Sequence, residues 1–131
     1  RDAVGISAED VSKWRTKSTA RYKQIAEVLR RGFTLDSRAT VHLRKALREI
    51  FSFRDLAIHP SGEVSAPIMH EELNVGVEWR FVYFRAVNAE KLVSLSRQII
   101  WELISAGKPS NDAVDQYAAS LRQRLSPEKP A

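Results

Sequence analysis

Apolar residues recur every three or four positions in four stretches of the chain, which is the spacing of an amphipathic helix. The first stretch opens at Ser7, a good N-cap residue with Asp10 three positions later, and it stops before Gly32. Its apolar stripe runs without a gap through Val11, Trp14, Ser18, Tyr22, Ile25 and Leu29. The pattern therefore predicts one long helix over residues 7–31.

Three more helices are predicted by the same spacing. The second covers residues 37–59, and Pro60 marks its end because proline disfavours helical geometry at the residue before it. The third covers residues 88–106 and is closed by Gly107. The fourth covers residues 111–125, where a clean apolar stripe is followed by a Ser-Pro pair.

Residues 60–87 interrupt the helical pattern with two prolines and two glycines. A period of two, typical of a strand, links Val75, Val77, Trp79, Phe81 and Tyr83. One strand is not stable alone. The segment is therefore expected to form a hairpin with residues 64–69, to pair across a dimer, or to lie extended along the helices.

These elements predict an all-α fold in a single domain over residues 1–131. Short connections join the first two and the last two helices, so we expect two antiparallel pairs packed as a bundle of four main helices. The insertion at 60–87 is extended and forms a β-hairpin in one of the alternatives above. With 131 residues, the chain is long enough to bury a core without disulfides or a metal.

Composition narrows the range of partners. The net charge of +5 is spread unevenly, because residues 1–60 hold 13 Lys and Arg against 7 Asp and Glu, a charge of +6, and residues 61–131 carry −1. Such a basic half favours an acidic partner such as RNA, although a solvated helix face has the same composition. There is no cysteine, which fits a reducing cytoplasm, and no apolar run of membrane-spanning length is present.

Arg54 is the most informative residue of the second predicted helix. On a projection at 100° per residue with Leu43 at zero, Ala46, Leu47, Ile50 and Ala57 all fall within roughly 60°, and Arg54 falls at about 20°. Burying an unpaired arginine is costly because its proton cannot be lost. Arg54 therefore has a carboxylate partner, or the stripe opens there onto a cleft or a second subunit.

Asp55 and His59 follow Arg54 on the flank of that stripe. They are four residues apart, so the carboxylate can orient or charge the imidazole. Arg54 and His59 are five apart, or about 140° on a regular helix. A long arginine side chain and unwinding of the helix before Pro60 would bring them together.

The string from Arg54 to His59 resembles the motif of the HEPN superfamily, an arginine, a polar residue, three or more variable residues and a histidine at the end of a helix in a helical bundle. The resemblance implies a metal-independent endoribonuclease, toxin- or defence-like, that acts on RNA as a homodimer with two motifs facing each other. Arg54, Asp55 and His59 would be its catalytic residues. It implies no cofactor and no metal, and an antitoxin or effector protein as a further partner.

Two features depart from that pattern. Toxins paired with a nucleotidyltransferase antitoxin often carry a tyrosine two residues after the histidine, where this chain has Ser61, so control by modification of that tyrosine is not expected. The strand-like residues 75–84 are an insertion relative to a minimal member. The residue chemistry fits RNA cleavage, because histidine can carry the proton and arginine matches phosphate oxygens.

Other interpretations of the same residues stay open. Arg54 can form a structural ion pair, and His59 can interact with the helix dipole. His42 is expected to be solvated, and the triplet from His70 to Glu72 is expected in a surface loop. The chain as a whole can be a catalytically silent HEPN-like module that binds RNA or protein, or a basic helical adaptor without a nucleic-acid role.

Overall fold

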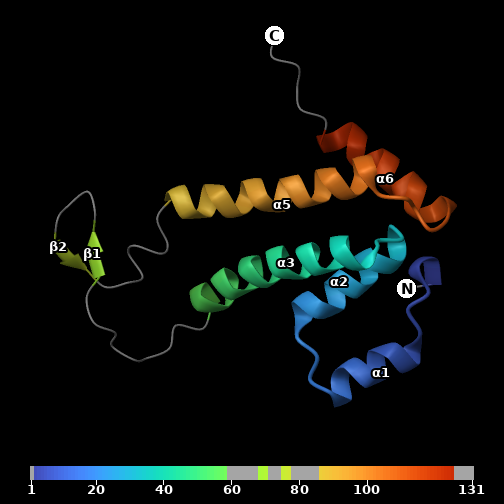
Figure 1. Ribbon diagram of the computed structural model, residues 1–131, viewed down its shortest axis with the longest axis horizontal. Coiled ribbons are helices and arrows are strands. Elements are labelled where there is room, and N and C mark those ends of the chain that lie inside the picture. The colour runs from blue at the N-terminus through green and yellow to red at the C-terminus, as the bar shows by residue number, and fades with distance from the viewer. Residues whose placement is uncertain (1, 59–67, 71–74, 78–85, 126–131) are drawn as a thin grey trace, which may run out of the picture.

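The computed structural model describes residues 2–58, 68–70, 75–77 and 86–125, and every structural statement below concerns these ranges. The fold is helical, as predicted. Its helices in chain order are the short 3₁₀ helix η1 (Asp2–Val4) and the α-helices α1 (Ala8–Thr16), α2 (Arg21–Gly32), α3 (Ser37–Ile58), α5 (Ala86–Ala106) and α6 (Asp112–Leu125) (Figure 1).

Two strands of three residues each lie between α3 and α5. The strand β1 (Ile68–His70) pairs antiparallel with β2 (Val75–Val77), and Ile68 is opposite Val77. The remaining residues of the predicted 60–87 insertion, up to Arg85, lie outside the described ranges.

Side-chain caps explain where several helices begin. Ser7 and Asp10 form the predicted capping box, in which the Asp10 backbone N–H donates to Ser7 Oγ and the Ser7 N–H donates to the Asp10 carboxylate. Asp36 accepts from the Ala39 N–H at 2.7 Å ahead of α3. Asn111 accepts from the Val114 N–H at 3.1 Å ahead of α6. Each cap satisfies a backbone donor that a helix end leaves unpaired.

The prediction of one helix over residues 7–31 is wrong, because the helix is interrupted between α1 and α2. Ser18 adopts a left-handed conformation with φ of 47°. Its N–H donates to Arg15 O and the Thr19 N–H donates to Trp14 O, so the last carbonyls of α1 are satisfied as in a Schellman motif. The sequence signal was hidden because serine occupies the position that glycine usually takes, while the apolar stripe continues past it.

Two antiparallel helix pairs form the body of the molecule. In Figure 1, α2 packs beside α3, α6 packs beside α5, and α3 and α5 lie between the two outer helices, while α1 stands apart. One core cluster joins α2 and α3 through Ala26, Leu43 and Leu47. The other joins the end of α2 to α5 and α6 through Phe33, Ile104, Val114 and Ala118.

The two pairs are locked together at the turn after α2. The backbone N–H groups of Lys108 and Ser110 donate to the carbonyls of Phe33 and Gly32, so the α5–α6 connection satisfies the open end of α2. Gly107 makes this approach possible. A Cβ there would collide with the Leu103 carbonyl oxygen and would lie 2.9 Å from Cδ1 of Phe33.

Unequal helix lengths leave the opposite end of the body uncovered. The 22 residues of α3 span about 33 Å and the 12 of α2 only about 18 Å, and α5 likewise outruns α6. No α3 residue after Leu47 and no α5 residue before Ile99 belongs to either core cluster. We call these two helix segments, residues 48–58 and 86–98, the open end.

A charged network ties the first turn of α1 to the last turn of α2. The Glu27 carboxylate accepts hydrogen bonds of 2.7 to 2.9 Å from the guanidinium groups of Arg30 and Arg31. Arg31 also donates to the Asp10 carboxylate at 3.1 Å and to the Gly5 carbonyl at 2.7 Å. The hydrogen bonds from Arg30, with help from Arg31, hold the pKa of Glu27 at about 2 although partial burial raises it.

Replacing Glu27 with glutamine is expected to lower the free energy of unfolding at pH 7 by about 2 kcal/mol. Because the pKa of Glu27 is lowered from 4.5 in the unfolded chain to about 2 on folding, its stabilisation is present above about pH 4.5 and is lost as the pH falls through about 2. Urea unfolding followed by circular dichroism should therefore show the difference between wild type and E27Q shrinking from pH 5 to pH 2.

The matched control is Glu9→Gln. Glu9 also forms an ion pair, with Lys13 at 2.8 Å, but its side chain is 75% exposed, so we expect little effect. An E27Q deficit that stays constant from pH 7 to pH 2 would contradict the electrostatic explanation.

Candidate functional site

Arg54 and Asp55 lie in the last turns of α3, at the open end. Their side chains are 58% and 59% exposed, and Nη1 of Arg54 lies 3.4 Å from Oδ1 of Asp55. The guanidinium carbon of Arg54 is also 5.8 Å from the centre of the Phe51 ring. Arg54 therefore has a carboxylate partner, but the pair is held at the surface and not in the core.

The break between α1 and α2 explains why Arg54 is exposed although it falls on the apolar stripe of α3. A single helix over residues 7–31 would span about 37 Å, long enough to run along all of α3. In Figure 1, α3 extends well past the start of α2. The observed α2 begins only at Arg21, and the core cluster that it forms with α3 reaches Leu47 and does not include Arg54.

An exposed pair of this kind contributes little to folding. Surface ion pairs are worth roughly 0–1 kcal/mol, and a contact of 3.4 Å between exposed side chains has no unusual geometry that would raise this value. The fold therefore does not need an arginine at this position, and the guanidinium is accessible to a ligand or to another subunit.

His59 and Ser61 lie outside the described residues, so the predicted approach of His59 to Arg54 stays a prediction. Arg54 donates a hydrogen bond to Asp55, so the carboxylate of Asp55 contacts the guanidinium. The triplet from His70 to Glu72 was expected in a surface loop. This is wrong for His70, which lies in β1, and Glu71 and Glu72 lie outside the described ranges.

A basic groove of about 690 Å³ lies between α3 and α5 at the open end, and sequence reasoning missed it. Its cations are Lys45 and Arg48 from α3 and Lys91 from α5. The other side chains lining it are Glu49, Ser52, Phe53, Leu56, Asn88, Leu92 and Leu95. The α3 residues that line the groove are three or four positions apart, so the sequence could have indicated that they share a second face of this helix.

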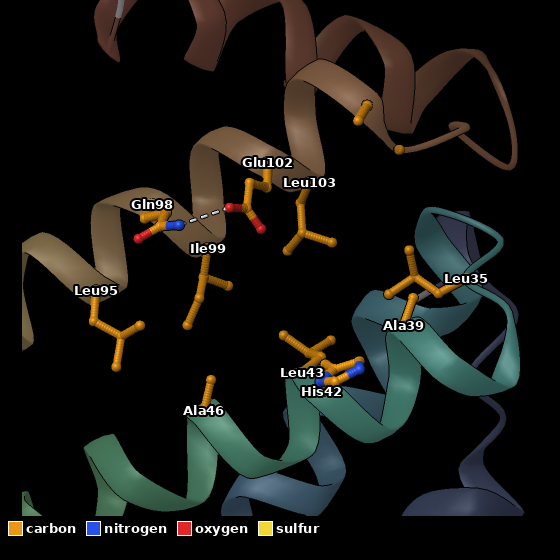
Figure 2. A pocket seen from close by; sticks show the side chains of 12 residues that line it. Leu35, Ala39, His42, Leu43, Ala46, Leu95, Gln98, Ile99, Glu102 and Leu103 are labelled. Atoms are coloured by element: carbon orange, nitrogen blue, oxygen red, sulfur yellow. Dashed lines mark hydrogen bonds between the residues drawn. The ribbon is translucent and has the colours of Figure 1, made fainter.

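A second cleft, of about 400 Å³, lies between the N-terminal half of α3 and the C-terminal half of α5. Figure 2 shows Leu95, Ile99 and Leu103 pointing from α5 toward Ala39, Leu43 and Ala46 of α3. Its polar side chains are His42, Gln98 and Glu102.

These polar groups do not form a catalytic pair in the described structure. His42 is exposed, as expected, and Glu102 accepts a hydrogen bond of 2.8 Å from Gln98 one turn earlier on the same helix (Figure 2). No hydrogen bond joins His42 to Glu102 within the described ranges.

A third cavity, of about 480 Å³, is an apolar groove to which α2, α3, α5 and α6 all contribute. Leu47 and Ile50 line it from α3, Ile100 from α5 and Tyr117 from α6. Ile100 is 39% exposed and Tyr117 is 65% exposed. Arg54 falls close to Leu47 and Ile50 on the projection of α3, so it continues the same face of the helix beyond this groove.

Among the described residues, His, Asp and Glu side chains do not gather in a group of three or more that would suit a metal ion. In the same ranges, no helix combines the length and the apolar character that a membrane span requires.

Comparison with known proteins adds no relative to this picture. The chain matches no protein-family model, no curated protein and no solved structure.

Proposed function

We propose that this chain is a metal-independent endoribonuclease of HEPN type, toxin- or defence-like, that acts on RNA as a homodimer in the cytoplasm. The observation that carries the proposal is the exposure of Arg54. It occupies the apolar stripe of α3 yet lies uncovered beyond the end of α2, paired only at the surface with Asp55. An arginine in this position is explained better by a ligand or a second subunit than by folding.

The chemistry assigns one role to each motif residue. The 2′-hydroxyl of the ribose attacks the adjacent phosphorus, and the bond from phosphorus to the 5′-oxygen breaks. His59 takes the hydroxyl proton or gives one to the leaving oxygen. Arg54 binds the non-bridging phosphate oxygens with its planar fork, and Asp55 holds the guanidinium until RNA binds.

Dimerisation supplies the second proton carrier, since one chain contributes one motif histidine. Support comes from the apolar groove and the open end, where Val87 and Val93 of α5 are 50% and 59% exposed. Because Arg54 continues the face of α3 that lines this groove, a second copy docked there would bring two motifs close together. In the same proposal, α2, α3, α5 and α6 are the four main helices of a HEPN-like bundle with a β-hairpin insertion.

The test is a cleavage assay on a mixed RNA population in excess EDTA, with the ends of the products identified by mass spectrometry. The proposal expects a 2′,3′-cyclic phosphate on one product and a 5′-hydroxyl on the other, which follow from attack by the 2′-hydroxyl. The proposal would be overturned if the RNA stays intact at protein concentrations at which the chain is dimeric.

A second candidate is a catalytically silent HEPN-like module that binds RNA or a protein such as an antitoxin or an effector. It is favoured by one observation, that the basic groove lies on a different face of α3 from Arg54 and does not include it. RNA binding that survives His59→Ala, with no cleavage by either form, would select this candidate over the nuclease.

A further inference from the structure

The basic groove at the open end has a composition suited to an anionic chain with apolar side groups. Phe53, Leu56, Leu92 and Leu95 provide its apolar lining from both helices. Three cations share the groove with one carboxylate, that of Glu49. The lining therefore combines positive charge with an aromatic ring and aliphatic surface.

The cations of this groove are not used by the fold. In the part of the chain that the structure describes, Lys45, Arg48 and Lys91 are exposed and take part in no ion pair or side-chain hydrogen bond. Arg30 and Arg31, by contrast, are both tied to Glu27. Three cations left without partners around one cavity repel one another, and an anionic ligand would relieve that repulsion.

We propose that the basic groove binds single-stranded RNA, with its phosphates on Lys45, Arg48 and Lys91 and its bases against the apolar lining. Nonspecific single-strand sites combine a positive groove with an aromatic surface in this way. This inference rests on the proposed function and deepens it, because it names the class of RNA. A strand with separated bases fits a groove between two helices, whereas a duplex offers only its outer phosphates.

The groove and Arg54 belong to different faces of α3. Ser52 and Leu56, which line the groove, are each two residues from Arg54 and so about 200° from it around the helix. RNA in the groove runs along α3 and must pass around the end of that helix to bring a phosphate to Arg54. The groove therefore positions the strand, and its cations are binding residues that take no part in the bond-breaking step.

The test measures binding of a fluorescent 12-nucleotide 2′-O-methyl RNA, which lacks the attacking hydroxyl and is therefore bound without being cleaved. The groove variant is K45Q/R48Q/K91Q. We expect its affinity at low salt to fall by at least about tenfold, and the slope of log K against log salt to become shallower by about 2 for three lost phosphate contacts.

The matched control is K17Q/K23Q/R124Q, which removes the same charge from exposed positions outside the groove. It should keep the salt slope within about 0.5 of the wild-type value. A charge-conserving variant, K45R/R48K/K91R, should bind nearly as well as wild type. Thermal unfolding of all variants checks that they fold, since the substituted side chains are on the surface.

Two outcomes would overturn the inference. One is a groove variant with wild-type affinity and salt slope. The other is a groove variant that binds RNA as wild type does but no longer binds an acidic helical peptide that wild type binds. That result would assign the groove to a protein partner. The proposed function is tested separately, by cleavage. If RNA binding depends on the groove but ordinary RNA is not cleaved, the inference is supported and the proposed nuclease activity is wrong.

Discussion

Replacing Arg54 with alanine is expected to slow RNA cleavage by about 100-fold or more, as the loss of a donor that stabilises developing charge does elsewhere. The guanidinium holds phosphate oxygens that gain negative charge on the way to the transition state, and no other residue of the motif has a permanent charge of that sign. The measurement is the single-turnover rate on one defined RNA in EDTA.

The same substitution should leave stability almost unchanged, within about 0.5 kcal/mol, because Arg54 is exposed and its pair with Asp55 is a surface pair. Arg54→Lys keeps the charge but loses the planar fork, so a smaller loss of rate is expected. Arg97→Ala is the matched control, an exposed arginine of α5 outside the basic groove. An R54A rate equal to the wild-type rate would contradict the assigned role.

Replacing Phe33 with alanine is expected to lower the free energy of unfolding by about 3–5 kcal/mol. Phe33 is 7% exposed and belongs to the core cluster that joins α2 to α5 and α6. Its ring also packs beside Gly107, in the turn whose Lys108 N–H donates to the Phe33 carbonyl. Removing the ring would therefore weaken the packing between the two helix pairs as well as the packing of α2 itself.

Equilibrium unfolding in urea measures this change, with Phe33→Leu as the comparison, since leucine keeps most of the apolar volume and should cost about 1–2 kcal/mol. Tyr117→Ala is a control at an aromatic residue that is 65% exposed and should cost less than Phe33→Ala. A cost below about 1 kcal/mol for Phe33→Ala would show that this cluster does not hold the pairs together.

The helices that the sequence predicted correctly carry their boundaries in local chemistry. Asp36 and Asn111 cap α3 and α6, and Gly107 follows α5, so the predicted ranges agree with the observed ones within a residue or two. The break after α1 could not be predicted this way. Ser18 takes a left-handed conformation with no glycine or proline to indicate it, and the apolar stripe continues through it.

That one missed break decides how much of the candidate site could be foreseen. The projection placed Arg54 on the apolar stripe, but its exposure depends on where α2 begins, which is a consequence of the turn at Ser18. The basic groove was missed for a related reason. Lys91 joins Lys45 and Arg48 only because α5 lies antiparallel beside α3, and no pattern within one helix contains that information.

The proposed endoribonuclease activity is tested most directly by the cleavage rate of His59→Ala relative to wild type, on the same RNA in excess EDTA. We expect wild type to cleave and H59A to be slower by about 100-fold or more, with an unchanged unfolding temperature and unchanged RNA affinity. Equal rates for the two proteins, or RNA left equally intact by both, would contradict the proposed activity.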